Sequence, residues 1–145
     1  MVIRRRFLKF IPLLLALLLL LSLILFLSRS PKEEEGIRFA VLLTLEDELV
    51  SSFAIGDSLT DGATKELLGT VTEMQVSPYY EETEKGVFPY PGKSRVLLTL
   101  TGSGAVKNGR ITVGGVPLLT GKRLSLHGRG AAEGVCLWAK REGVK

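Results

Sequence analysis

The chain of 145 residues has few of the residues that most often carry chemistry: one cysteine, one histidine and one asparagine. The single cysteine, Cys136, excludes an internal disulfide, so any folded part must be stabilised by its hydrophobic core. Cys136 lies in the apolar stretch 135–138 (VCLW), which favours a small buried side chain over a reactive thiol. An intermolecular disulfide across a homodimer is the alternative.

The shortage of histidine weighs against a metal centre, because such a site needs several convergent ligands. His127 follows the apolar positions of its strand out of phase, which predicts a solvent-facing side chain at a strand end. A calcium loop beginning at Asp57 would place leucine at its third and twelfth positions, where oxygen ligands are required. Three glycine-rich segments lack the spacing of phosphate-binding loops and are interpreted as turns: 102–104, 121–122 and 128–130. We expect neither a metal nor a cofactor.

One short stretch does suggest an enzyme. Residues 56–62, GDSLTDG, resemble the first block of the GDSL lipases and esterases, in which the serine of the motif attacks an ester. Such a serine needs a histidine base and an aspartate that orients it, and the family supplies them in a late Asp-x-x-His block. Here the residue three before His127 is Leu124, and Asn108 is followed by Gly109 rather than aspartate. We expect no catalytic residue: Gly56 ends a short helix, and the 61–62 pair makes a turn.

The positive charge of the chain is not spread over a nucleic-acid-binding surface. The formal net charge is +4, yet residues 36–145 hold 13 Lys and Arg against 12 Asp and Glu. Most of the excess therefore belongs to the N-terminus, and no basic stripe interleaved with aromatic residues remains. We expect no nucleic-acid partner.

What the chain has in excess is leucine near its start. Residues 10–28 are 19 consecutive uncharged residues, 11 of them leucine. At about 1.5 Å per helical residue this run spans roughly 28 Å, close to the roughly 30 Å hydrocarbon core of a bilayer. A cleaved signal peptide is the alternative, but its apolar stretch is usually about 7–15 residues long. We predict a retained single membrane span.

The flanking charges predict the orientation of that span. Arg4, Arg5, Arg6 and Lys9 precede it, whereas three glutamates dilute the basic residues that follow it. Because positive charge is retained on the cytoplasmic side, the N-terminus is expected inside and the rest outside. The expected organisation is a basic cytoplasmic segment (1–9), a transmembrane helix (10–28), a polar spacer (29–36) and an extracytoplasmic β domain (37–145).

Apolar alternation with period two predicts a strand at 37–45, and further strands follow between glycine-rich turns. A short helical segment is expected at 46–53, and a bulge near Thr72 where the apolar phase slips. The pattern predicts an all-β domain, a small barrel-like one with one short helix, because closure removes exposed edges. The other expected strands are 68–76, 95–101, 110–113, 122–126 and 134–140.

The segment VLLTL occurs twice, at 41–45 and 96–100. In both halves an Ile-Gly-Asp or Val-Gly-Gly step follows, then a Leu-Leu pair and another strand. The repetition is either chance in a leucine-rich chain or the trace of a duplication, in which case two similar halves close one barrel.

Residues 78–92, PYYEETEKGVFPYPG, are expected to form a long loop because they contain three prolines. Four of the ten aromatic residues lie here, and they are the candidate binding residues: Tyr79, Tyr80, Phe88 and Tyr90. Aromatic side chains on a loop suit an interface, since they bring large contact area at little entropic cost. The alternative is that they fold back and cover one end of the barrel.

The overall arrangement is similar to a known bacterial family. The apolar span, the Gly-Asp step at 56–57, LLGTVTEMQVSP (67–78) and RITVGGVPLLTGKRLSL (110–126) resemble domain of unknown function 4330. The resemblance implies a single-span protein of the bacterial cytoplasmic membrane, supplies no catalytic residues and gives the Gly-Asp step a structural role.

Together these features predict a non-enzymatic, membrane-anchored β module of the cell envelope that scaffolds or binds other envelope proteins. An alternative is a carbohydrate-binding accessory of envelope polysaccharide assembly or export, in which the aromatic residues stack on sugars. An esterase using Ser58 ranks third. The expected partners are the membrane, through residues 10–28, and other envelope proteins, with a homo-oligomer left open.

Overall fold

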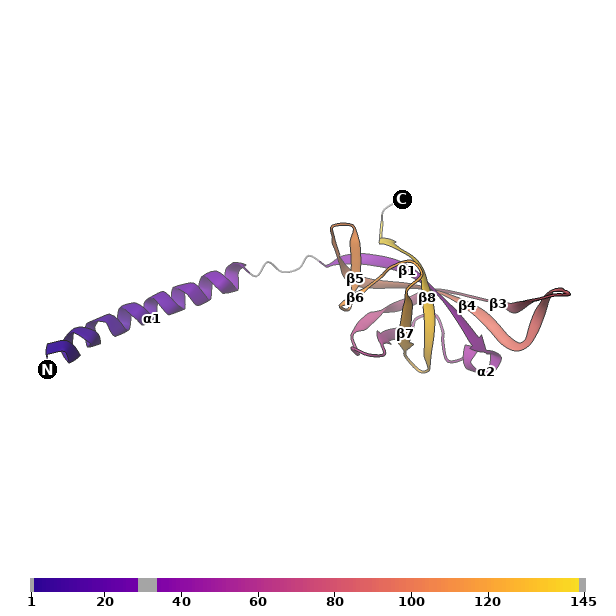
Figure 1. Cartoon of the computed structure of the whole chain (residues 1–145), viewed down its shortest axis with the longest axis horizontal. Coiled ribbons are helices and arrows are strands. Elements are labelled where there is room, and N and C mark those ends of the chain that lie inside the picture. Colours follow the sequence, from indigo (N-terminus) through magenta and orange to yellow (C-terminus); the bar gives the residue numbers. More distant parts are fainter. Residues whose placement is uncertain (1, 29–33, 144–145) are drawn as a thin grey trace. The chain divides into compact units, whose positions relative to one another are not determined.

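The computed structural model describes residues 2–28 and 34–143, and the side chains from residue 8 onward (Figure 1). The chain divides into two compact units, one containing helix α1 and the other containing all the strands. Of the expected spacer 29–36, residues 29–33 lie outside the described part of the chain.

The first unit is a single helix, α1 (Val2–Ser28), with Pro12 inside it. Its segment Leu8–Ser28 has a mean hydropathy of 3.1, and none of its side chains is buried. The helix is long and apolar enough to cross a membrane, as the leucine content predicted. It begins at Val2, so residues 2–9, expected as a cytoplasmic segment, continue the same helix.

The second unit is one antiparallel sheet with a single short helix, which confirms the all-β prediction. The elements are β1 (Glu35–Glu46), α2 (Asp47–Val50), β2 (Ser58–Asp61), β3 (Leu67–Thr83), β4 (Gly86–Lys107), β5 (Arg110–Val113), β6 (Val116–Pro117), β7 (Arg123–His127) and β8 (Ala131–Arg141).

The sheet closes on itself through β1. Its strand order is β1-β8-β7-β2-β3-β4-β5-β6, and β1 also pairs with β4. Six strands therefore form a closed ring, β1-β8-β7-β2-β3-β4, while the β5–β6 hairpin extends from β4. Closure gives both edges of β1 a hydrogen-bonded neighbour, β4 on one side and β8 on the other.

Alternation along β1 explains the core. Ile37, Phe39, Val41 and Leu43 are fully buried, as the period-two pattern predicted. They pack against inward side chains of the other ring strands, and the core includes Leu59, Leu68, Val71, Val96, Leu98, Leu100, Leu124, Leu126 and Cys136. The expected bulge is confirmed, because the β3–β4 register shifts between Val71 and Glu73.

The expectation of a loop at 78–92 was wrong. Strand β3 runs on to Thr83 and β4 begins at Gly86, and a two-residue turn of Glu84 and Lys85 joins them. Proline is depleted in strands because it lacks a donor N–H, and for that reason the three prolines suggested a loop. A strand with an unpaired edge tolerates proline, because no N–H donor is needed on that side. Strands β3 and β4 therefore continue through the three prolines.

Gly56 does not end the short helix. Helix α2 ends at Val50, and Ser51 is its C-cap in a right-handed conformation. Gly56 lies five residues further on with a φ of 94°, and its N–H donates to the carbonyl of Val71 at 2.8 Å. The glycine therefore forms the bend that leads into β2 rather than a helix end.

The two VLLTL segments lie side by side. They pair antiparallel in β1 and β4, with Leu42 directly opposite Leu97. These two residues occupy the same position in each repeat, so a two-fold relation between the halves would pass through this pair. The later Leu-Leu pairs do not follow that relation, because Leu67-Leu68 opens β3 whereas Leu118-Leu119 precedes β7.

Candidate interaction surface

The candidate aromatic residues lie on a β-hairpin, here called the arm (residues 78–94), that projects beyond the rest of the sheet (Figure 1). Within 79–92 the described pairings join its two strands only to each other: Tyr80 with Pro89, Glu81 with Phe88, Glu82 with Val87 and Thr83 with Gly86. Apart from the half-buried Tyr79 and Ser94, every arm residue is exposed. The aromatic side chains therefore do not cover the end of the core.

A large bulge lies near the base of the arm. Pro78 pairs with Ser94, and the next pair is Tyr80 with Pro89, so Tyr79 alone faces the four residues 90–93. Gly92 within this bulge has a φ of 86°, a conformation that glycine adopts without strain. Bulges bend and twist a strand pair, and this one redirects the arm relative to the ring.

Two of the four predicted residues, Tyr79 and Tyr90, pack together near the base of the arm and form what is here called the aromatic face. The rings of Tyr79 and Tyr90 pack edge to face, with centroids 6.3 Å apart and planes at 77°. Phe88 lies nearer the tip, where it pairs across the hairpin with Glu81. Tyr80 lies on the opposite face with Val87.

Two cations extend the aromatic face toward the ring. The ammonium of Lys93 lies 5.1 Å from the centroid of the Tyr90 ring. The guanidinium carbon of Arg95 lies 5.6 Å from the centroid of the Tyr79 ring. Both distances fall within the range of cation–π attraction. One surface thus holds an aromatic cluster with positive charge at its base.

The charge reverses toward the tip. Glu81, Glu82 and Glu84 lie in the outer half of the arm, and Lys85 is the one basic residue there. The base carries Lys93 and Arg95. The base is nevertheless of mixed charge, because Glu46 of β1 lies directly opposite Lys93 and the carboxylate of Asp47 accepts a hydrogen bond from Ser94.

Helix α2 contacts the base of the arm. The carboxylate of Asp47 accepts a hydrogen bond from the hydroxyl of Ser94 at 2.5 Å. A shallow pocket of about 340 Å³ lies here, lined by Asp47 and by both strands of the arm's base, Val76–Pro78 and Tyr90–Ser94. The helix therefore helps to hold the arm where it leaves the ring.

Sequence reasoning missed the two cations and the exposed Val76 and Val87, which are 52% and 62% exposed. Lys93 and Arg95 stand outside the segment that was expected to be a loop or at its boundary. Two segments of equal length, 79–83 and 86–90, flank a two-residue turn. This spacing in the sequence could have predicted a hairpin.

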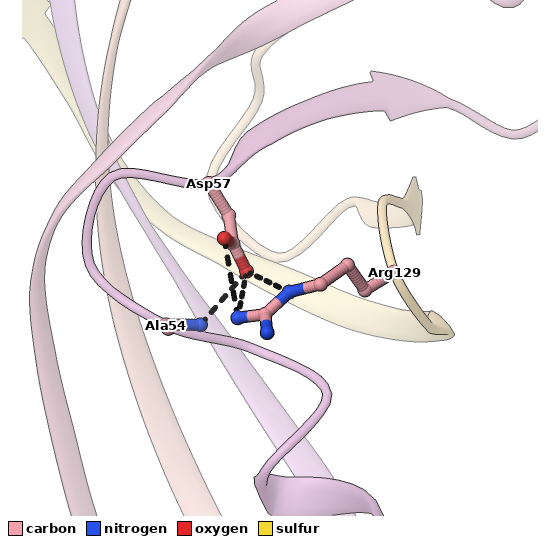
Figure 2. A network of polar contacts seen from close by, with 3 residues as sticks. All are labelled: Ala54, Asp57 and Arg129. Carbon is pink, nitrogen blue, oxygen red and sulfur yellow. Dashed lines mark hydrogen bonds and ion pairs between the residues drawn. The ribbon is translucent and has the colours of Figure 1, made fainter.

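The GDSL-like stretch packs as a structural corner (Figure 2). The carboxylate of Asp57 accepts hydrogen bonds from the Ala54 N–H at 2.9 Å and from two guanidinium nitrogens of Arg129 at 3.0 to 3.3 Å. The Asp57 carbonyl accepts from the Val71 N–H at 2.9 Å. Asp57 therefore connects the β7–β8 turn to the bend before β2.

Ser58 and His127 line one shallow pocket of about 420 Å³, together with Asp57, Thr60, Gly128 and Arg129. Among the hydrogen bonds of residues 34–143, none joins Ser58 to His127, and the Thr60 hydroxyl donates to the His127 carbonyl at 3.3 Å. Leu59, between Ser58 and Thr60, is fully buried in the core. His127 is half-buried rather than fully exposed.

Asp61 forms the turn after β2. Its carboxylate, in a residue only 7% exposed, accepts from the N–H groups of Ala63 and Thr64 at 3.1 and 2.9 Å and from the Thr64 hydroxyl at 3.1 Å. The backbone hydrogen bond from Thr64 is the main cause that lowers the pKa of Asp61 below its ordinary value of 3.8. This carboxylate is a structural anion.

Cys136 is fully buried in β8, and burial raises the pKa of its thiol. Its position in the core confirms the small hydrophobic role and does not suit an intermolecular disulfide. Within the described residues, no group of three or more His, Cys, Asp and Glu side chains could hold a metal ion.

No family model matches the chain, and neither a curated protein nor a solved structure is significantly similar to it. The resemblance to domain of unknown function 4330 stays a prediction.

Proposed function

We propose that the protein is a non-enzymatic β module of the bacterial cell envelope, anchored by α1, that binds another envelope protein through the arm. The observation that carries the proposal is the projecting hairpin with its exposed aromatic face. A two-stranded hairpin is marginally stable in water, and large aromatic side chains on such an element are costly to leave solvated. Contact with a partner would stabilise both.

The location is part of the same proposal. The cluster of basic residues before the apolar run supports an N-terminus in the cytoplasm and a β domain outside. Several features of the sequence resemble domain of unknown function 4330, and that likeness supports a bacterial cytoplasmic membrane.

The cations favour a protein over a sugar as the ligand. Lys93 and Arg95 each occupy one face of a tyrosine on the aromatic face, which leaves less ring surface free to stack on a sugar. Tyrosine and arginine together are the residues most enriched at the centres of protein interfaces.

The test is cross-linking of the full-length chain in its native membrane, followed by affinity recovery. We expect Tyr79→Ala and Tyr90→Ala combined to reduce partner recovery at least tenfold, because truncation of central aromatic residues costs about 2 kcal/mol or more. Trp138→Ala is the matched control, since Trp138 is an exposed aromatic residue on β8 that also contacts a lysine. Equal recovery with both variants would refute the proposal, and binding to envelope glycans alone would favour the carbohydrate alternative.

A further inference from the structure

We propose that the β domain docks on the anionic lipid headgroups of the membrane that holds α1, through the turn between β4 and β5. The four exposed residues of this turn, 107–110, are here called the basic turn. The inference rests on the proposed function only in that α1 is the anchor. It adds a second surface, at the other end of the sheet from the arm, whose partner is a lipid surface.

The basic turn lies at the end of the sheet where the chain enters β1. In the antiparallel pairing of β1 with β4, Glu35 stands opposite Gly104, and β4 continues three residues further, to Lys107. At about 3.3 Å per residue the turn therefore projects roughly 10 Å beyond the first residue of β1. The arm leaves from the other end of β1, where Glu46 stands opposite Lys93. Figure 1 shows β5 and the arm at opposite ends of the sheet.

The connection to the apolar helix is short. Helix α1 ends at Ser28, and β1 begins at Glu35. Because an extended chain advances at most about 3.6 Å per residue, the start of β1 is tethered within about 25 Å of the end of the span. The basic turn is on the side of this tether. It therefore meets the headgroups of the same membrane at a high effective concentration.

Nearby acids do not cancel the charge of the basic turn. Residues 85–132 contain no Asp or Glu, and neither Lys107 nor Arg110 takes part in the three ion pairs found among the described residues. The acid closest in register, Glu35, is already paired with Arg141 at 2.8 Å. The positive excess thus lies on the part that projects furthest. The charged residues at this end are Lys107, Arg110, Lys140 and Arg141, against Glu34, Glu35 and Glu142.

The opposite end of the β domain is acidic. The arm, its base and the adjoining helix α2 carry six acids and three bases, so an anionic surface repels this end and attracts the basic turn. Both effects favour one orientation, in which the arm points away from the membrane and toward other envelope proteins. The residues counted are Glu46, Asp47, Glu48, Glu81, Glu82 and Glu84, with Lys85, Lys93 and Arg95.

The test uses the full-length chain in vesicles of phosphatidylcholine, with or without anionic phosphatidylglycerol. Asn108→Cys carries a fluorescent label, which lipids with a nitroxide on the headgroup quench only at contact range. Cys136 is fully buried, so it stays unlabelled in the folded chain. The same label at Lys85→Cys, in the turn of the arm, is the matched control position. We expect quenching at 108 in anionic vesicles, its loss without anionic lipid or in high salt, and none at 85.

Neutralising the basic turn should release it from the surface. Lys107→Gln with Arg110→Gln should lower the docking equilibrium constant about 30-fold, because each basic residue near an anionic surface contributes about fivefold. Both side chains are exposed, so the melting temperature should not change. Lys122→Gln with Arg123→Gln removes the same charge from two exposed residues at the start of β7, where Arg123 pairs with Val135 in the middle of β8. This control should leave the quenching unchanged.

Quenching at 108 that requires both anionic lipid and the two basic residues supports the inference. It is overturned by an absence of quenching at 108, by equal quenching at 108 and 85, by quenching that is the same without anionic lipid, or by equal effects of the two neutralised pairs. If the turn does not dock but the arm still recovers an envelope protein, the proposed function stands without this inference. If the turn docks and the arm recovers nothing, the inference stands and the proposed function fails.

Discussion

At the residue scale, the polar side chains of the GDSL-like stretch make structural contacts. The carboxylate of Asp57 accepts from a local backbone N–H and from Arg129, 72 residues away. The carboxylate of Asp61 closes the turn after β2. A short match to an enzyme motif therefore coincides with a corner of the fold, because tight turns and active-site loops both favour glycine, aspartate and serine.

Asp61→Ala should lower the free energy of unfolding by about 1–3 kcal/mol at pH 7, because it leaves two backbone N–H groups without their acceptor. The folded-state pKa of Asp61 lies below its ordinary value of 3.8, so the carboxylate stabilises the fold above that pH. This contribution is lost as the pH falls from about 4 through the lower, folded-state pKa.

Urea unfolding of the unaltered and Asp61→Ala chains at pH 7 and in steps below pH 4 measures both effects. The difference between the two chains should shrink toward acid. Glu48→Gln, an exposed carboxylate on α2, is the control and should change little at either end. A difference that stays constant with pH would contradict the role assigned to the charge.

At the scale of elements, period-two alternation predicted most strands, because one face of each strand packs into the core. The same reasoning failed for the arm, in which both faces are exposed and no alternation is required. Its strands continue because β3 and β4 already pair at the ring and the register carries on past the bulge. The Glu84-Lys85 turn then closes the hairpin.

The close approach of β3 and β4 near the start of β3 depends on two glycines, Gly69 and Gly102. A Cβ atom on Gly69 would lie 2.6 Å from the carbonyl oxygen of Thr101, and one on Gly102 would clash with the carbonyl oxygen of Leu68. The two backbones approach closely only because neither residue has a side chain.

Gly102→Ala should therefore destabilise the fold by about 1–3 kcal/mol, since backbone atoms cannot move aside as a flexible side chain would. Urea unfolding measures the change. Ser103→Ala, at the exposed neighbouring position, is the control and should stay within about 0.5 kcal/mol of the unaltered chain. Equal stability of both variants would show that the strands separate without cost.

At the scale of the whole molecule, the chain combines an apolar helix with a closed antiparallel sheet. The two differ in where their apolar side chains lie. Leu8–Ser28 is exposed along its whole length, whereas the core of the sheet is internal and complete. The helix is thus the element of the described chain that is long and apolar enough to cross a membrane.

The full-length chain should resist alkaline carbonate extraction from membranes. Leu18→Arg with Leu19→Arg should release it, because an arginine at the centre of a span costs about 2.5–3.5 kcal/mol by insertion scales. Leu18→Ile with Leu19→Ile is the control and should stay in the membrane. The intact mass of the membrane-bound chain is the second measurement, and loss of the N-terminal residues would support the cleaved signal peptide instead.

The sequence by itself determined the apolar span, the all-β class, the bulge and most turns. These features depend on local composition and on the period-two alternation of apolar residues. The candidate aromatic residues were also visible there. Their arrangement was not, since three prolines made a hairpin resemble a loop.

Only the tertiary structure decided which strands pair. The contacts between residues far apart in the sequence follow from that pairing. Pairing of β1 with both β4 and β8 closes the ring, and pairing of β2 with β7 brings Asp57 beside Arg129. The aromatic face likewise exists only because the pairing of β3 and β4 sets Tyr79 beside Tyr90. Local periodicity says which way a side chain points from its own strand, but the free energy of strand pairing is shared among residues far apart in the chain.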